Sequence, residues 1–126
     1  MAQSSYRIFL YGPLKDERAL ARVIGREPAV SEAVLPGYRK FTESEGERSY
    51  PTVEPDPQNP DKTVRGKTLH ASPQDMYAVD AWQGPYSRFL ALLGDRQPAW
   101  VYYYAAPEPG REYAPQREQA GFTKQA

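Results

Sequence analysis

Residues 6–14 read YRIFLYGPL, and this stretch decides how the rest of the chain can fold. Residues 8–11 are aromatic or branched types that favour a largely buried strand. Pro13 cannot donate to a strand ladder, so the strand must end by Gly12. The Gly-Pro pair therefore predicts a turn at a strand tip. Such a turn either simply joins the strand to a helix, or presents the backbone amides of Gly12 and Leu14 to a bound anion.

The length and composition fit one domain with a single core. The chain has 126 residues, and its 16 basic and 16 acidic side chains give a formal net charge of zero. This balance implies no basic face for nucleic acid or anionic lipid, so we expect neither partner. The absence of cysteine excludes disulfides, thiolate nucleophiles and zinc-thiolate sites, and a single histidine argues against a histidine-based metal site.

Nothing in the sequence resembles a targeting or membrane segment. Residues 1–5 (MAQSS) lack the basic start and apolar core of a signal peptide, and no apolar run approaches the length of a membrane span. We therefore expect a soluble, cytoplasmic protein without a membrane partner. The 10 tyrosines and 13 prolines favour short strands, many turns and an aromatic-lined interior over a helical bundle.

The first half of the chain predicts a short helix followed by strands. Apolar residues at helical spacing predict a helix over residues 14–24, with Gly25 as its C-terminal stop. Residues 29–41 predict two strands, or one bent strand, around a Pro-Gly pair. The polar residues 42–49 (TESEGERS) predict a solvated loop. A short strand over residues 50–53 follows, which its proline confines to an edge or a bulge, and then a proline-rich surface excursion.

The second half predicts a strand, the clearest helix of the chain and a hairpin. Residues 63–71 alternate as a strand does, and Gly66 inside them suggests a bulge. Ser72 is the predicted N-cap of a helix that Gly84 ends. Two further strands, residues 86–93 and 99–105, predict a hairpin. We therefore predict a single domain over residues 1–105 and a weakly ordered tail over residues 106–126.

Three pieces of this sequence, in order, resemble the gamma-glutamylcyclotransferase-like family, which includes gamma-glutamylamine cyclotransferases and AIG2-like proteins. They are residues 11–14 (YGPL), residues 79–84 (VDAWQG) followed by Tyr86 and Arg88, and residues 100–102 (WVY). The family has Tyr-Gly-Thr-Leu, then Leu-Asp-x-(Phe/Tyr)-Glu-Gly with Tyr and Arg, then a strand of the type Val-Trp-Val-Tyr. The resemblance covers about residues 6–105. It implies an α+β fold, a small mixed β-barrel with flanking short helices.

The resemblance also implies a chemistry, from which this chain departs at two positions. Family enzymes release pyroglutamate from a gamma-glutamyl amine or peptide: the substrate's alpha-amine attacks its own side-chain carbonyl while a glutamate removes a proton, and no cofactor or metal is needed. Here Gln83 stands at the position of that glutamate, and Pro13 replaces the small hydroxyl residue. Glutamine cannot accept the proton, although its carbonyl oxygen can accept a hydrogen bond from an ammonium group. Natural loss of catalysis, a shifted base and a substitution made to trap a ligand all remain open.

The same resemblance assigns the predicted substrate-binding residues. The backbone of the turn formed by Tyr11, Gly12, Pro13 and Leu14 would hold the substrate alpha-carboxylate, with Gly12 and Leu14 as the remaining donors. Tyr86 and Tyr102 match family tyrosines near the pocket, and are otherwise ordinary strand tyrosines.

Residues outside the quoted motifs supply the other candidates. Arg88 is expected to pair with Asp80 or to lie on the surface, and Trp82 is expected in the core. His70 and the loop carboxylates Glu43, Glu45 and Glu47 are the candidates for a shifted base.

We therefore expect a small-molecule gamma-glutamyl or amino-acid ligand and a monomer or weak homodimer. The first functional hypothesis is a cyclotransferase, if a base is available. The second is a non-catalytic binding or interaction module, a pseudoenzyme on the same fold. The third is an unrelated small barrel, in which Gln83 would lie far from Gly12.

Overall fold

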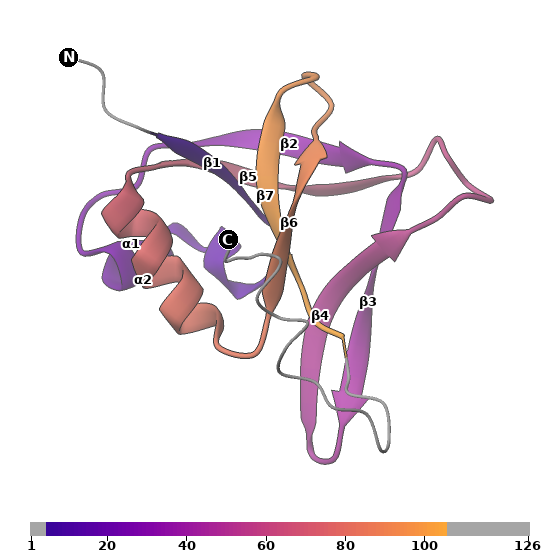
Figure 1. Ribbon diagram of the computed structural model, residues 1–126, viewed down its shortest axis with the longest axis horizontal. Coiled ribbons are helices and arrows are strands. Elements are labelled where there is room, and N and C mark those ends of the chain that lie inside the picture. Colours follow the sequence, from indigo (N-terminus) through magenta and orange to yellow (C-terminus); the bar gives the residue numbers. More distant parts are fainter. Residues whose placement is uncertain (1–4, 106–126) are drawn as a thin grey trace.

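The computed structural model describes residues 5–105, and Figure 1 follows the chain through its helices and strands. The elements, in chain order, are β1 (Tyr6–Leu10), the short 3-10 helix η1 (Pro13–Lys15), α1 (Glu17–Ile24), β2 (Val30–Pro36), β3 (Tyr38–Glu45), β4 (Arg48–Pro55), β5 (Thr63–Ala71), α2 (Pro73–Gln83), β6 (Ser87–Leu92) and β7 (Pro98–Tyr103).

The strands of the described region form two sheets. One is a five-stranded sheet in the order β2-β5-β1-β7-β6, and the other is the two-stranded hairpin β3-β4. β1 lies at the centre, antiparallel to β5 and parallel to β7. The predicted α+β class is confirmed, as is the predicted β6-β7 hairpin. The sheets do not close into a true barrel. The curled five-stranded sheet brings its two edges together where the Gly94 N–H donates to the Val34 carbonyl at 2.9 Å.

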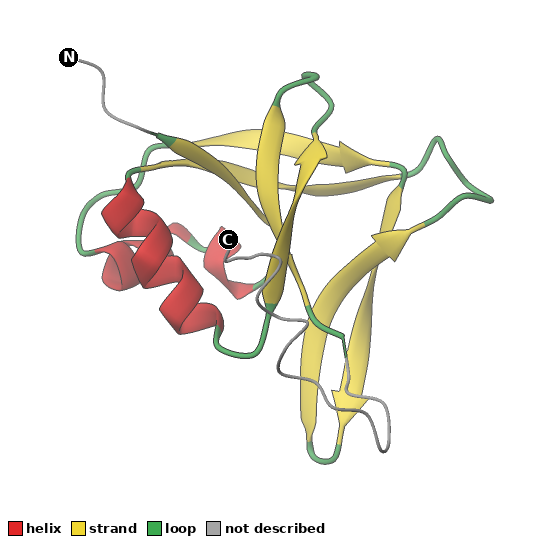
Figure 2. Cartoon of the chain, in the orientation of Figure 1, coloured by secondary structure: helices red, strands yellow, loops and turns green. Residues whose placement is uncertain are grey.

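The alternation along β1 separates two apolar layers. Ile8 and Leu10 face one way and are buried with Leu20 of α1 and Val79 of α2. Phe9, between them, faces the other way and is buried in the second layer, which includes Val53 of the β3-β4 hairpin. Figures 1 and 2 show the helices gathered on one side of the sheet, while the hairpin extends away from them. The central strand is thus covered on both faces, which explains its uninterrupted apolar sequence.

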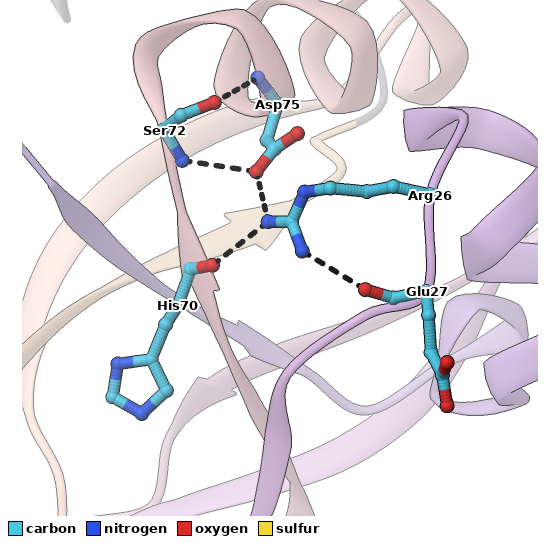
Figure 3. A network of polar contacts seen from close by, with 5 residues as sticks. All are labelled: Arg26, Glu27, His70, Ser72 and Asp75. Carbon is cyan, nitrogen blue, oxygen red and sulfur yellow. Dashed lines mark hydrogen bonds and ion pairs between the residues drawn. The ribbon is translucent and has the colours of Figure 1, made fainter.

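A polar network fixes the start of α2 (Figure 3). The Ser72 hydroxyl accepts from the Asp75 amide at 3.1 Å, and the Asp75 carboxylate accepts from the Ser72 amide at 3.0 Å, so the predicted N-cap is confirmed as a full capping box. The Arg26 guanidinium also donates to this carboxylate and to the carbonyls of His70 and Glu27. A side chain just past the end of α1 therefore ties that helix to α2 and to the end of β5.

Two local predictions were wrong. Residues 42–49 are not a loop: they belong to the β3-β4 hairpin, which turns at Gly46 with a φ of 64°. Most of these side chains are exposed, so the stretch lacks the alternation that identifies a half-buried strand. Gly66 is not a bulge either, because the register with β2 runs through it without interruption. A Cβ there would lie 2.8 Å from Phe9 Cζ and would also collide with the Leu10 carbonyl, so close packing explains the glycine.

The remaining predictions concern the helices and the tail. Gly25 ends α1, as predicted, and it has the left-handed conformation with a φ of 76°. Neither helix in residues 5–105 is long and apolar enough to cross a membrane. The predicted tail, residues 106–126, lies outside the described residues.

Candidate functional site

A hollow at the tip of β1 brings together segments that are far apart in the sequence. The turn after β1 forms one wall, the C-terminal end of α2 another, and β4 contributes Pro51. The lining residues are Phe9, Leu10, Tyr11, Gly12, Pro13, Leu14, Pro51, Gln83, Tyr86 and Tyr102. All the site residues predicted from the sequence are among them. The free volume of the hollow is about 20 Å³, close to what one water molecule needs, so the hollow is narrow.

The turn at residues 12–14 has two backbone amides whose residues, Gly12 and Leu14, line this hollow. Pro13 occupies the first position of η1, and the Gly12 carbonyl accepts from the Lys15 amide at 3.0 Å. The amides of Gly12 and Leu14 have no hydrogen-bond partner among the described residues. Backbone N–H groups are obligatory donors, so these two are available to water or to a ligand. A Cβ on Gly12 would lie 3.7 Å from Pro51 Cγ, in ordinary contact.

Gln83 is the last residue of α2, and its position follows from how that helix ends. Gly84 has a φ of 60°, and its amide donates to the Asp80 carbonyl at 3.3 Å. This turn leaves Gln83 half-buried in the lining of the hollow that Gly12 also lines. None of the residues that line the hollow has a charged side chain. A glutamine amide at this wall can donate and accept hydrogen bonds but cannot act as a base.

Two buried tyrosines close the base of the hollow. The Tyr11 hydroxyl donates to the Tyr102 carbonyl at 2.5 Å, and the Tyr102 hydroxyl donates to the Asp80 carboxylate. Burial raises the pKa of Tyr11 and of Tyr102, and the Asp80 carboxylate raises the Tyr102 pKa further. Both phenols therefore stay protonated at neutral pH. Arg88 holds Asp80 through two hydrogen bonds of 2.9 and 3.1 Å, which confirms the predicted pair.

Tyr86 joins two parts of the lining of the hollow through a side-chain hydrogen bond, which we call the Tyr86 latch. Its hydroxyl donates to the Pro51 carbonyl at 2.7 Å, which joins the loop after α2 to β4. Burial raises the pKa of Tyr86 to about 12, with a further contribution from Tyr50. The ring packs against Tyr50 and Tyr104, with centroids 6.1 and 5.8 Å away. These contacts hold the Tyr86 side chain in place at the hollow.

The other candidates lie elsewhere. His70 is exposed on β5, and its imidazole points away from the Arg26 network (Figure 3). Glu45 accepts a hydrogen bond from the Tyr104 hydroxyl, and neither it, Glu43 nor Glu47 lines the hollow. Trp82 was predicted in the core but is 48% exposed, because it lies on the outer face of α2. Within the described residues, no group of three histidine, cysteine, aspartate or glutamate side chains is arranged to hold a metal ion.

Sequence reasoning missed Pro51. The proline was predicted to sit on an edge strand, and it does, since β4 pairs only with β3 in the described region. Its place opposite Gly12 depends on how the hairpin folds over the sheet, and no local pattern records that arrangement.

Comparison with known structures supports the same fold. Two solution structures of proteins from Arabidopsis thaliana each have a TM-score of 0.67 to this chain, at 20% and 23% sequence identity. The alignments cover 82% and 92% of this chain, and 64% and 81% of those proteins. The chain thus spans slightly less than two thirds of the first of them. A protein named gamma-glutamyl cyclotransferase also has a TM-score of 0.67, at 16% identity, covering 81% of this chain and 68% of its own.

The sequence itself carries the family assignment. Among curated proteins, none matches the chain. The model of one protein family, described as gamma-glutamyl cyclotransferase, AIG2-like, matches residues 8–121. This match spans both walls of the hollow and most of the chain, so the protein belongs to the gamma-glutamyl cyclotransferase, AIG2-like family.

Proposed function

We propose that this protein binds a gamma-glutamyl amine or peptide in the hollow at the tip of β1. The observation that carries the proposal is that Gly12 and Gln83 line the same hollow. Such a ligand has a carboxylate and an ammonium group on one carbon. The unpartnered amides of Gly12 and Leu14 suit the carboxylate, and the Gln83 carbonyl oxygen suits the ammonium group. The surrounding tyrosine rings exclude water from the aliphatic part of the ligand.

The narrowness of the hollow adds a step to binding. A volume of about 20 Å³ does not admit a gamma-glutamyl group, which has many more atoms than one water molecule. We propose that the Tyr86 latch is the contact that opens, because one side-chain hydrogen bond to Pro51 joins the loop after α2 to β4 at the hollow. Ligand binding is therefore coupled to movement of the loop after α2.

Turnover would need a proton acceptor that the lining residues do not supply. In pyroglutamate release, the alpha-amine attacks the side-chain carbonyl carbon, the bond from that carbon to the leaving amine breaks, and one proton passes from the attacking nitrogen to the leaving one. A group that takes this proton contributes about 10²- to 10⁴-fold to such a step. Gln83 cannot take it, and the buried tyrosines stay protonated. We therefore propose a binding protein in which this release is absent or very slow.

One arrangement favours a second candidate, a cyclotransferase with a shifted base. Tyr102 lines the hollow and its hydroxyl donates to the Asp80 carboxylate, so a proton leaving the substrate would have a route through the phenol to Asp80. Arg88 opposes this role, because its two hydrogen bonds stabilise the ionised carboxylate and make it a weak base.

Titration calorimetry with a panel of gamma-glutamyl amines tests the proposal, with mass spectrometry of the same samples for pyroglutamate. Saturable binding without product supports the binding protein, and product that disappears in Asp80→Asn supports the shifted base. No binding to any member of the panel contradicts both. Gly12→Val is the blocking variant, because its side chain extends into the hollow. Gly12→Ala, whose Cβ would only touch Pro51 at 3.7 Å, is the matched control for folding.

Three further proposals concern the domain, the oligomeric state and the cellular location of the protein. We propose that residues 1–105 act as one domain, that the protein works as a monomer or weak homodimer, and that it resides in the cytoplasm with small gamma-glutamyl compounds. Light scattering across a concentration series tests the oligomeric state.

A further inference from the structure

A second and much larger cavity lies between the β3-β4 hairpin and the β6-β7 hairpin. Its volume is about 600 Å³, against about 20 Å³ for the hollow, and small-molecule sites commonly measure about 300–1,000 Å³. We call it the aromatic groove after its five aromatic side chains, Tyr38, Phe41, Phe89, Tyr103 and Tyr104. It shares no lining residue with the hollow, so the two are separate cavities.

Three strands supply one aromatic wall of this groove. Ser87 pairs with Tyr103, and directly opposed residues of an antiparallel pair project to the same face, as do residues two apart on a strand. Phe89 and Tyr103 therefore project from the same face of the β6-β7 hairpin. The Phe89 ring packs against the rings of Tyr103 and Tyr38, with centroids 5.6 and 5.7 Å away. All three rings stay half-buried, so they keep apolar surface open to the groove.

The charged side chains in the lining are both carboxylates. They are Glu43 on β3 and Glu54 on β4. Glu54 pairs with Arg39, whereas Glu43 is half-buried and makes no ion pair or hydrogen bond with any residue in the range 5–105. The groove therefore combines aromatic rings with a negative charge that the rest of the domain does not neutralise.

The chain itself shows how this surface holds a cation. The Arg39 guanidinium lies over the Phe41 ring, 5.3 Å from its centroid, and pairs with the Glu54 carboxylate. An aromatic face attracts a cation, and a carboxylate adds a charge-assisted hydrogen bond. Glu43 is two residues beyond Phe41 on the same strand, so both project from the same face of the hairpin. The same chemistry is thus available a second time, beside the other rings, without a cation from the described part of the chain.

We propose that the aromatic groove is a second binding site, which takes a small organic cation: an amine with an aromatic or aliphatic group. The ammonium group pairs with the Glu43 carboxylate, and the apolar group packs against the rings of Phe41 and Phe89. The carboxylate selects cationic ligands over neutral and anionic ones, and the rings exclude water from the apolar group. This site does not depend on what the hollow binds, so it stands or falls separately from the proposed function.

The test is a titration of ¹⁵N-labelled full-length protein with phenethylammonium, followed by amide chemical shifts. Phenethyl alcohol is the neutral analogue and hydrocinnamate the anionic one. We expect saturable shifts at the amides of Glu43 and Phe89, with a dissociation constant of about 1 mM for so small a ligand. The alcohol should bind about tenfold more weakly and hydrocinnamate should not saturate. Binding of the amine should weaken as salt rises.

Variants of the hairpin separate the roles of charge and ring. Glu43→Gln should bind the amine about tenfold more weakly while leaving the alcohol unchanged. Glu47→Gln is the matched control, because Glu47 is an exposed carboxylate of the same hairpin that does not line the groove. Phe41→Leu keeps an apolar side chain but removes the ring, so it should weaken the amine severalfold.

Several outcomes would overturn the inference. Equal affinity for the amine and the alcohol, or equal amine binding by the parent and Glu43→Gln, would show that the carboxylate selects nothing. Groove amides that ignore the amine but move with protein concentration would assign the groove to a second copy of the chain. Shifts confined to residues 106–126 would place the amine outside the groove, and amine binding lost in Gly12→Val would place it in the hollow. If amine binding persists while no gamma-glutamyl compound binds, the proposed function fails and the groove site stands.

Discussion

Placing a carboxylate at the end of α2, by Gln83→Glu, tests whether the hollow holds a ligand in position for pyroglutamate release. Glutamate is nearly isosteric with glutamine, so Gln83→Glu changes the proton chemistry of the wall without changing its shape. A correctly placed general base contributes about 10²- to 10⁴-fold, which corresponds to about 3–5 kcal/mol of barrier. We therefore expect Gln83→Glu to release pyroglutamate at least about a hundredfold faster than the parent.

The structure also predicts how this gain depends on pH. The new carboxylate would be half-buried at the negative end of a helix, in a hollow whose lining has no charged side chain. Burial and the helix dipole both raise its pKa, and the dipole alone contributes about 0.3–1 kcal/mol, less than one pKa unit. Turnover should rise with pH as this group ionises and then level off. Stability should change in the opposite direction: the variant loses stability as the pH rises from the usual carboxyl pKa through the raised one.

The assay is the appearance of pyroglutamate and free amine, measured by mass spectrometry across a pH series, with ligand affinity measured in parallel. Gln74→Glu is the control, since it makes the same change at an exposed position near the start of α2. If Gln83→Glu binds ligand as tightly as the parent yet releases no product, residue 83 does not face the reacting amine, and the reasoning about this wall is wrong.

Three further predictions concern the latch, the sheet and the polar network. Tyr86→Phe removes the 2.7 Å hydrogen bond to Pro51, so ligand association measured by stopped flow should become faster at a stability cost of about 1 kcal/mol; an unchanged rate would show that the hollow opens elsewhere. Gly66→Ala should lower the free energy of unfolding in urea by about 3 kcal/mol because its Cβ meets the first strand, and a stability equal to the parent's would contradict the packing. Burial raises the pKa of Asp75, but the hydrogen bonds and charge of Arg26, with the capping hydrogen bonds, outweigh this and lower the pKa overall. The parent should therefore lose stability as the pH falls from about 4 through that lowered pKa, and Asp75→Asn should be less stable near neutrality and lack this acid-dependent loss; parallel stability profiles would refute the linkage.

Local patterns were enough to predict most of the elements. The dense apolar run of β1, the Ser72 cap and the left-handed Gly25 each act within a few residues of their own position, and the structure has them as expected. The outer part of the β3-β4 hairpin, residues 42–49, was missed because it lies beyond the core, where neither face is buried consistently. The alternation that reveals a strand comes from burial, and exposed strands do not have it.

The candidate site was predicted in part, for a related reason. The motifs gave both the β1 turn and the end of α2, and the structure places them in one hollow. The place of Pro51 and its contact with Tyr86 follow from how the hairpin folds against the sheet. Those contacts join residues more than thirty positions apart, or depend on strand register, so no short stretch of sequence contains them.

The parallel pairing of β1 with β7 has a consequence for synthesis on the ribosome. Ile8 and Phe9 pair with Trp100 and Val101, so the strand that lies beside the first one is the last of the described strands to be translated. Until it emerges, the nascent chain exposes an unsatisfied strand edge that invites misassembly or capture by chaperones. Tyr102, at the base of the hollow, arrives with that same strand. A product that ends before β7 would therefore lack both the strand beside β1 and Tyr102 of the hollow, and we expect it to be degraded.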